Sequence, residues 1–274
     1  MGEPFIGRPR PYKKERVIED RNRAAMDRWR GHVAVVTGAS SGIGRAITLG
    51  LLKAGMRVAV CARRLEAIEG LGEEAGMPDA FLACRVDLRV ASEIGGFFDT
   101  VRKRWQGVHV LVNNAGLGFA GDLASQDPGQ WREMLEVNVL ALCICTQQAL
   151  AQMKEHHDES HIIHIGSMSG HRMPPGANGV YGATKFAVRA LTESLRQEMQ
   201  VAKRPVRVTT ISPGLVETGF ASNYAGSADA AEKTYGALKC LQSEDVASAV
   251  LYALAQPDHV QIHDILLRPK EQGS

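Results

Sequence analysis

Short apolar runs alternate with longer amphipathic segments along the chain from residue 32 onward. The apolar runs are HVAVVTG, MRVAVCA, AFLACRVD, VHVLVNN, HIIHIGS and VRVTTIS, and each is bounded by turn-forming residues. Such runs, rich in β-branched residues, are typical of strands buried on both faces of a parallel sheet. A last short run, HDILLRP, predicts an additional edge strand.

The segments between the apolar runs show helical periodicity. They predict helices over residues 43–54, 65–75, 90–105, 130–155 and 181–201. Because strands that alternate with helices form right-handed βαβ crossovers, the pattern predicts an α/β fold with a doubly wound, Rossmann-type parallel sheet flanked by helices. The sequence shows no internal repeat and no linker, so residues 29–274 are expected to form a single domain.

The first 28 residues differ from the rest of the chain in composition. Basic residues outnumber acidic ones there, and the apolar content is low. A segment of this kind has too little apolar surface to join a core, so residues 1–28 are predicted to be a disordered basic leader. The leader lacks the apolar run of a signal peptide, and its acidic residues argue against a mitochondrial presequence, since presequences are poor in acidic residues.

The overall composition excludes several classes of partner. A net charge of +2 gives no bulk attraction to nucleic acid, so no nucleic-acid partner is expected. No apolar run approaches the ~20 residues that a membrane-spanning helix needs. The five cysteines are scattered through apolar segments, which is typical of buried thiols in a reducing compartment, and a cytoplasmic location is expected.

A glycine-rich turn, TGASSGIG at residues 37–44, joins the first predicted strand to the first predicted helix. Gly38, Gly42 and Gly44 let the backbone turn tightly and approach a pyrophosphate held at the helix N-terminus. The spacing differs from G-x-G-x-x-G, and Arg45 and Ala46 stand where a P-loop requires Lys and Ser or Thr. The alternative is a tight turn with a purely structural role.

The ends of the next strands carry further candidate cofactor contacts. Arg63 and Arg64 follow the second strand, where an NAD-binding protein would carry an acidic residue, and guanidinium groups suit a 2′-phosphate. Two solvated arginines at the start of a helix are the alternative. Asp87 and Leu88 end the third strand, and the fourth closes with NNAG at residues 113–116, which either lines the cofactor cleft or forms a simple turn.

Taken together, the motifs identify a family. TGASSGIG, NNAG, Asn138 in LEVNVLA, Ser167 in GSMSG, YGATK and SPGLVET occur in the order found in short-chain dehydrogenases/reductases. The resemblance extends from about residue 29 to residue 269. It departs from the family pattern at Gly166, where Ser or Asn is usual, and at His164, where Asn is common.

The resemblance implies an NADP(H)-dependent enzyme and assigns its site residues. The implied catalytic residues are Asn138, Ser167, Tyr181 and Lys185, of which Ser167 and Tyr181 contact the substrate. The expected cofactor contacts are Gly38, Ser40, Ser41, Gly42, Ile43, Gly44, Arg63, Arg64, Asp87, Leu88, Asn114, Tyr181, Lys185, Pro213, Gly214, Val216 and Thr218. By the same resemblance, Lys185 binds the nicotinamide ribose and Asn138 holds a water that links Lys185 to solvent.

The YGATK motif places a phenol and an ammonium four residues apart, on one face of a predicted helix. A phenol has a reference pKa of about 10, and a nearby ammonium stabilises the phenolate. We therefore expect Lys185 to lower the pKa of Tyr181, so that Tyr181 exchanges a proton with the substrate. Ser167 would donate a hydrogen bond to the carbonyl oxygen.

The expected function is NADPH-dependent reduction of a hydrophobic ketone or aldehyde, steroid-like or another apolar carbonyl. One alternative is an NADP-dependent isoprenoid alcohol dehydrogenase of the farnesol type. Another is a catalytically silent nucleotide-binding regulator, against which the intact set of candidate catalytic residues argues. The apolar faces of the helices at 130–155 and 181–201 exceed one buried stripe, which predicts a homodimer or homotetramer.

Other features complete the expected site. Residues 215–240 are rich in small residues and contain Phe220, Tyr224 and Tyr235, a composition suited to a lid over an apolar substrate. Met168, Met173 and His171 are expected to form the opposite wall.

The histidines between residues 156 and 171 do not predict a metal site. They are His156, His157, His161, His164 and His171. Strand alternation points several of them apart, and carboxylate or cysteine partners at ligand spacing are missing, so no metal is expected.

Overall fold

A single parallel sheet organises the chain. The computed structural model describes residues 25–156, 158–173, 179–225, 236 and 238–272. Within them, a seven-stranded sheet has the order β3-β2-β1-β4-β5-β6-β7. The strands are β1 (Val33–Thr37), β2 (Arg57–Ala62), β3 (Phe81–Arg85), β4 (Val110–Asn113), β5 (Ser160–Ile165), β6 (Val206–Pro213) and β7 (Asp264–Leu267). The predicted doubly wound α/β fold is confirmed, with β7 as the predicted edge strand.

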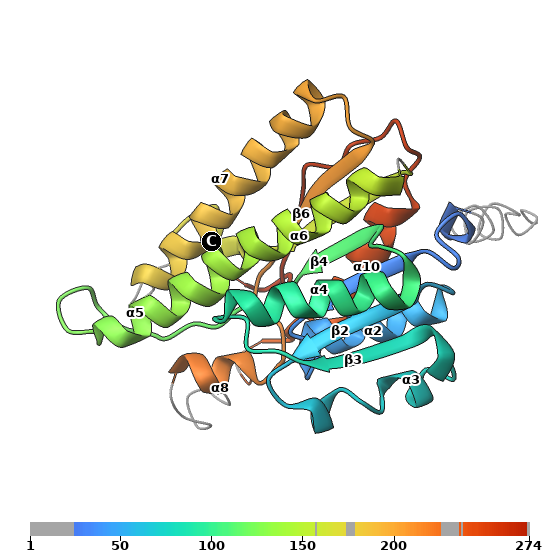
Figure 1. Cartoon of the computed structure of the whole chain (residues 1–274). Helices are drawn as coiled ribbons and strands as arrows, with labels where there is room; N and C mark the ends of the chain where they lie inside the picture. The colour runs from blue at the N-terminus through green and yellow to red at the C-terminus, as the bar shows by residue number, and fades with distance from the viewer. Residues whose placement is uncertain (1–24, 157, 174–178, 226–235, 237, 273–274) are drawn as a thin grey trace, which may run out of the picture.

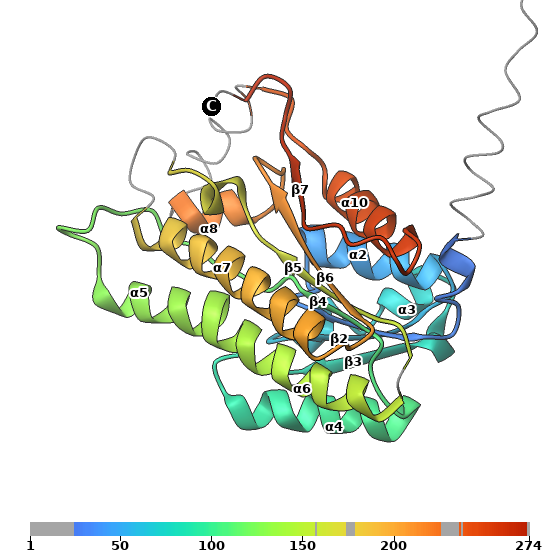
Figure 2. The ribbon, with the colours of Figure 1, turned by 90° about the horizontal axis from the view of Figure 1, so that it is seen from above.

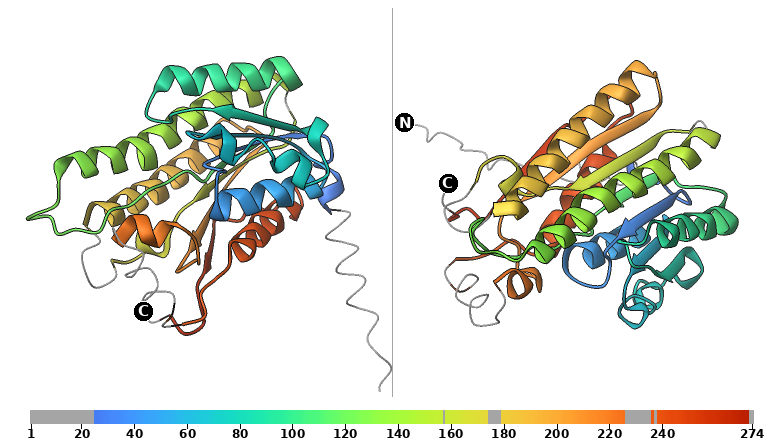
Figure 3. Two further views of the ribbon diagram at one scale, coloured as in Figure 1. Left: turned by 90° about the horizontal axis from the view of Figure 1, so that it is seen from below. Right: turned by 60° about the vertical axis from the view of Figure 1, so that its left-hand side comes forward.

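Helices cover both faces of this sheet, so the molecule has three layers (Figures 1 and 2). One face carries α2 (Gly42–Lys53) and α10 (Ser243–Ala255), and the other carries α4 (Ala91–Trp105), α6 (Ala141–His156) and α7 (Gly179–Val201). The shorter helices are α3 (Leu71–Glu74), α5 (Pro128–Leu135) and α8 (Phe220–Ala225). Figure 3 shows the same layers from two further sides.

The central strands are buried on both faces, as their continuous apolar runs predict. All five residues of β1 are buried. Val33 and Val35 pack into the cluster under α4 and α6, whereas Ala34 and Val36 pack into the cluster under α2 and α10. This alternation gives one apolar core on each side of the sheet.

The predicted helix over 65–75 is wrong. The segment forms a 3₁₀ turn at Leu65–Ala67 and then the short helix α3. Gly70 and Gly72 interrupt it, and glycine is unfavourable inside a helix. Gly72 has a packing reason, because a Cβ there would lie 2.8 Å from Cβ of Phe81.

Two helices lie where the sequence pattern gave no helix. α10 begins with a capping box formed by Gln242 and Asp245, a start signal that the apolar periodicity alone does not show. α8 lies within residues 215–240, whose composition suits a lid and shows no helical periodicity. Tyr235 lies outside the described residues.

The long helix predicted over 130–155 is present but not uniform. α5 passes into α6 through a π-helical turn at Glu136–Leu140. By length and composition, Pro128–His156 is long and apolar enough to cross a membrane. Core helices of folded proteins pass the same test, and α6 packs against α4 while the π-helical turn packs against α7. The segment Pro128–His156 therefore belongs to the helical layer on one face of the sheet.

The chain joins the core before the first strand. Met26 packs against the α2–α10 side of the core, and Trp29 is buried. The indole of Trp29 donates a hydrogen bond to the carbonyl of Leu254, 2.9 Å away. Residues 1–24 lie outside the described residues, so the leader at 1–28 and the domain boundary at 29 stay predictions.

Candidate active site

A cavity of about 980 Å³ opens at the carboxyl ends of the strands. Its lining includes every predicted catalytic and cofactor-binding residue except Asn138: Gly38, Ser40, Ser41, Gly42, Ile43, Gly44, Arg63, Arg64, Asp87, Leu88, Asn114, Ser167, Tyr181, Lys185, Pro213, Gly214, Val216 and Thr218. Most of these residues lie at or just after the carboxyl ends of β1 to β6, which the parallel sheet brings to one edge, whereas Tyr181 and Lys185 lie on α7. Open α/β sheets bind their ligands there.

The glycine-rich turn is shaped for close approach of a ligand. Gly38 and Gly42 have φ angles of 69° and 54°, values that residues with a side chain rarely adopt. A Cβ at Gly44 would lie 2.4 Å from both the carbonyl oxygen of Gly38 and Nδ2 of Asn114. Asn114 locks the turn, since its Nδ2 donates hydrogen bonds to the carbonyls of Thr37 at 2.9 Å and Gly38 at 3.0 Å.

The first turn of α2 suits an anionic group. Ser41 makes no side-chain capping hydrogen bond, and the first turn contains no acidic residue. Its backbone N–H groups and the positive end of the helix dipole therefore face a cavity lined by Ser40 and Ile43. Thr218 lies over this turn, because a Cβ on Gly42 would be 2.9 Å from its Cγ2. The arrangement fits a pyrophosphate.

One end of the cavity is basic. Arg63 and Arg64 are exposed and line it, as does Arg89, which the sequence analysis missed. The only signal for Arg89 was its place directly after Asp87-Leu88. Its guanidinium pairs with Asp87 at 2.6 Å, and this pairing lowers the pKa of Asp87 to about 2. The Arg89 guanidinium thereby balances the negative charge of the Asp87 carboxylate, and Arg63 and Arg64 add further guanidinium groups at this end of the cavity.

A second missed residue, Gln272, closes the cavity near the C-terminus. Its Oε1 accepts a hydrogen bond from the backbone N–H of Leu215 at 3.0 Å. Nothing in the local sequence signals this role, because the contact depends on how the chain returns after β7.

Tyr181 and Lys185 lie one turn apart near the start of α7, as predicted. Both are buried, and Nζ of Lys185 is 5.9 Å from the centre of the Tyr181 ring. Nζ also donates a hydrogen bond to the carbonyl of Ile165 at 3.1 Å. The pair is therefore anchored to the end of β5, the strand that leads to Ser167.

The predicted lowering of the Tyr181 pKa is wrong for this structure. Burial raises the pKa of Tyr181 to about 12, and a side-chain hydrogen bond with Ser167 offsets part of this rise. Burial also lowers the pKa of Lys185 to about 8. Burial is the largest cause of both shifts, because each charged form loses its hydration. At neutral pH the phenol keeps its proton, and most of the lysine is charged.

Ser167 lies where β5 ends and caps a 3₁₀ turn, Met168–Gly170. Its Oγ accepts a hydrogen bond from the backbone N–H of Ser169 at 3.1 Å. Since Ser167 also hydrogen-bonds Tyr181, the two hydroxyls converge on one point in the cavity. A carbonyl oxygen placed there would meet two O–H donors.

Asn138 lies behind the cavity wall in the π-helical turn, a helix type found frequently at functional sites. Its Nδ2 donates hydrogen bonds to the carbonyl of Leu117 at 2.8 Å and to Oγ1 of Thr184 at 3.0 Å. Its Oδ1 accepts from the Leu117 N–H at 2.9 Å. The side chain joins the loop after β4 to α7, and the predicted water beside Asn138 stays a prediction.

Aromatic side chains from α8 cover Tyr181. The rings of Phe220 and Tyr224 each lie 5.5 Å from the Tyr181 ring, and they stack on each other at 5.8 Å. Met168 lines the cavity, as expected, but the described lining includes neither Met173 nor His171. Met173 is half-exposed over Gly182, and His171 points toward β6 and β7.

Buried histidines form fixed hydrogen bonds. Thr192 donates its hydroxyl to the carbonyl of Val188 at 2.7 Å, so its Oγ1 accepts from Nδ1 of His164 at 2.8 Å. His161 pairs with Thr209 at 2.8 Å in the same way. His157 lies outside the described residues.

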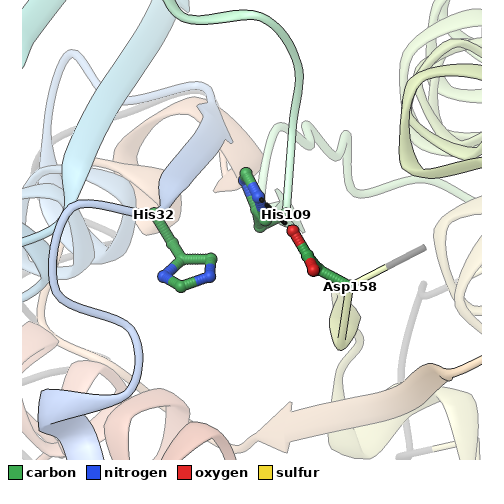
Figure 4. A group of neighbouring side chains, drawn as sticks. All are labelled: His32, His109 and Asp158. Atoms are coloured by element: carbon green, nitrogen blue, oxygen red, sulfur yellow. Dashed lines mark ion pairs between the residues drawn. The ribbon is translucent and has the colours of Figure 1, made fainter. Parts of the chain in front are cut away.

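A separate polar group lies at the amino ends of β1, β4 and β5, away from the cavity. It consists of His32, His109 and Asp158 (Figure 4). Nδ1 of His109 accepts a hydrogen bond from the backbone N–H of Val33. The neutral ring therefore carries its proton on Nε2, which faces Asp158 at 3.7 Å. A metal ion would need that nitrogen unprotonated, so the geometry favours an electrostatic contact over a metal site.

Acid should destabilise the fold through His164. Burial lowers its pKa from 6.5 to about 3, so at pH values between these two the unfolded chain binds a proton that the folded chain does not. The contribution of His164 to the free energy of unfolding is therefore fully present above about pH 6.5, and the free energy of unfolding falls by a few kcal/mol toward pH 4. In urea unfolding at pH 7.5 and pH 4.5, His164→Asn should lose less stability than the unmodified protein. The exposed control His259→Asn should match the unmodified protein, and equal acid losses in all three proteins would contradict this cause.

The chain is similar to several known oxidoreductases. A family model described as short chain dehydrogenase matches residues 32–228. Dehydrogenase/reductase SDR family member 11 from Gallus gallus is 48% identical over 91% of this chain and 100% of its own length. Farnesol dehydrogenase from Aedes aegypti is 43% identical over 89% of this chain and 98% of its own length.

The solved structure of the closed form of serine dehydrogenase complexed with NADP+ is 34% identical, with a TM-score of 0.82. The match covers 88% of this chain and 96% of that one. The chain therefore belongs to the short-chain dehydrogenase/reductase family, as its motif order predicted, and it is an oxidoreductase.

Proposed function

We propose that the protein reduces a hydrophobic ketone or aldehyde with NADPH and that Tyr181 donates the proton. One observation carries this proposal: the hydroxyls of Ser167 and Tyr181 converge beside Lys185 in a cavity that also reaches Arg63 and Arg64. The hydroxyls of Ser167 and Tyr181 suit a reacting carbonyl. The guanidinium groups of Arg63 and Arg64 suit a 2′-phosphate. The NADP+ complex of the related serine dehydrogenase supports this choice of cofactor.

The cofactor, when bound, supplies a hydride to the carbonyl carbon. Ser167 donates a hydrogen bond to the carbonyl oxygen, and Tyr181 transfers its proton to that oxygen, which leaves an alcohol and a phenolate. The Lys185 ammonium, 5.9 Å from the Tyr181 ring, stabilises the phenolate once it forms. Because the resting phenol has a raised pKa, the structure favours Tyr181 as an acid over Tyr181 as a base near neutral pH.

The lining near Tyr181 supports an apolar substrate. Phe220, Tyr224, Met168 and Leu117 contribute apolar surface around the point where the hydroxyls converge. The same wall suits a steroid-like ketone or an isoprenoid, and the Aedes aegypti farnesol dehydrogenase supports the isoprenoid alternative. A catalytically silent regulator is the weaker alternative, because a binding protein has no need of a buried proton donor.

A substrate panel separates these alternatives. Purified protein with NADPH is offered steroid ketones, farnesal and a quinone, and with NADP+ it is offered farnesol. The reductase proposal predicts turnover of at least one apolar carbonyl that exceeds farnesol oxidation. Faster farnesol oxidation at neutral pH would favour the isoprenoid alcohol dehydrogenase.

We also propose that two or four copies assemble through the α5–α6 and α7 faces. The prediction of this interface rests on apolar residues of these helices. Several of them, including Ala141, Leu142 and Val188, are buried within one copy and are not available for an interface. The exposed large apolar side chains on these helices are Leu135, Leu140, Phe186 and Val201, of which Val201 is the last residue of α7. The cytoplasmic location stays a prediction from the sequence.

Light scattering tests this assembly. The unmodified protein should be a dimer or tetramer at micromolar concentration, and the double variant Leu140→Glu/Phe186→Glu should be smaller because it places charge in an apolar interface. Val90→Glu, an exposed apolar position before α4, serves as the control and should leave the mass unchanged. A monomeric unmodified protein would contradict the proposal.

A further inference from the structure

His171 follows the 3₁₀ turn that Ser167 caps, yet its side chain turns away from the cavity. Its Nε2 lies 3.0 Å from Oδ2 of Asp264 and 3.1 Å from Oγ of Ser212. The imidazole is mostly buried, with 16% of its side chain exposed. It therefore connects the serine turn to the end of β6 and the start of β7.

The partners of His171 are themselves placed next to the cavity. Ser212 directly precedes Pro213 and Gly214, both of which line it. Asp264 begins the edge strand β7, whose later residue Leu267 accepts a hydrogen bond from the Gly214 N–H at 2.7 Å. A shift of β7 would thus reach the cavity floor through β6.

Asp264 is a mostly buried carboxyl group that several neighbours contact or face. Its Oδ1 is buried and has no hydrogen-bond partner among the described residues. Burial raises the pKa of Asp264, while Ser212, His171, Arg189 and Arg196 oppose the rise. Arg196 is itself engaged with Glu193 and the carbonyls of Val208 and His263.

The serine turn packs closely on its other sides as well. A Cβ at Gly170 would lie 2.7 Å from the carbonyl oxygen of Lys185 in α7. A Cβ at Gly166, just before Ser167, would lie 3.0 Å from Oγ of Ser212. The turn is thus held between α7, which carries Tyr181, and β6, and His171 supplies its side-chain link to β6 and β7.

We propose that His171 is a positioning residue, which holds Ser167 in place beside Tyr181 by linking the serine turn to Ser212 and Asp264. The inference rests on the proposed carbonyl reduction for its kinetic consequence. The inferred placement of Ser167 beside Tyr181 does not depend on which substrate the protein reduces.

His171→Leu removes both polar contacts with a side chain of similar size. Because a misplacement of ~1 Å in a catalytic group costs about a hundredfold in rate, kcat should fall about tenfold to a hundredfold. The dissociation constant of NADPH should stay within about threefold, since the glycine-rich turn and Arg63 are untouched. His171→Gln keeps a donor and an acceptor, and it should restore most of kcat.

A readout without turnover separates positioning from stability. The Ser167 hydrogen bond lowers the pKa of Tyr181, so displacement of Ser167 should raise it. In an ultraviolet titration, the Tyr181 signal is obtained by difference from Tyr181→Phe. Its midpoint should move up in His171→Leu and Ser167→Ala, and stay in place in His171→Gln. The control His161→Leu, a buried histidine on β5, should lower the melting temperature without moving the midpoint.

The partner is tested by a double-mutant cycle. Asp264→Asn should lower kcat less than His171→Leu, and the double variant should lose little more than His171→Leu alone, because both changes break one link. Unchanged kcat and midpoint in His171→Leu would overturn the proposal, as would a lower melting temperature with an unmoved midpoint. If no carbonyl is reduced but the midpoint moves as expected, the proposed function fails and the positioning role stands.

Discussion

Replacement of Tyr181 by phenylalanine should lower kcat for carbonyl reduction by a factor of ~100 to 10,000, the usual contribution of a general acid. The ring contacts with Phe220 and Tyr224, at 5.5 Å each, do not involve the hydroxyl and should persist. NADPH affinity should therefore change little. Turnover and a fluorescence titration of NADPH on the same preparation measure both quantities.

Tyr252→Phe is the matched control for this loss. It removes the same hydroxyl from an exposed tyrosine on α10, away from the cavity. Its kcat should equal that of the unmodified protein. Near-native turnover in Tyr181→Phe would show that another group supplies the proton.

The second large effect concerns the choice of cofactor. Charge-assisted hydrogen bonds from Arg63 and Arg64 to a 2′-phosphate are each worth roughly 1.5–3 kcal/mol, which corresponds to a preference for NADPH over NADH of about tenfold to several hundredfold. Arg63→Asp removes an attraction, adds a repulsion and offers a carboxylate to the free ribose hydroxyls of NADH. The preference should fall sharply or invert.

The measurement is the ratio of kcat/KM with NADPH to kcat/KM with NADH, at one salt concentration because exposed charges are screened. Arg64→Ala should have the smaller effect if Arg63 is the nearer group. Arg104→Asp, an exposed arginine in the last turn of α4, makes the same charge change away from the cavity and should leave the ratio unchanged. An unmodified protein that uses both cofactors equally, or prefers NADH, would place Arg63 and Arg64 on a merely solvated surface.

Local sequence patterns predicted most of the fold because the pattern and the tertiary structure agree. Each central strand is an apolar run, and β1 is buried along its whole length. The parallel sheet then brings the ends of the strands together, so Gly38, Arg63 and Ser167 line one cavity although they are far apart in sequence. The predicted helix at 65–75 failed because close packing of Gly72 against Phe81 outweighed the apolar periodicity.

Other features depend on contacts that no local pattern contains. His171 contacts Asp264 because β7 lies beside β6 in the sheet. Its side chain therefore does not form part of the cavity wall, where the sequence predicts it. The pKa of Tyr181 was misjudged because spacing reveals the ammonium but not the burial of both groups. The π-helical turn at Asn138 was missed for a similar reason, since its sequence is compatible with a regular helix.

Single-turnover reduction measures the proposed chemistry without interference from product release. Protein in excess over NADPH is mixed with an apolar ketone that the substrate panel has identified, and the loss of cofactor fluorescence and the appearance of the alcohol are followed together. The proposed function predicts one alcohol for each NADPH in the unmodified protein and almost none over the same time in Tyr181→Phe. NADPH that binds tightly to the unmodified protein but stays reduced with every apolar ketone and aldehyde offered would contradict it.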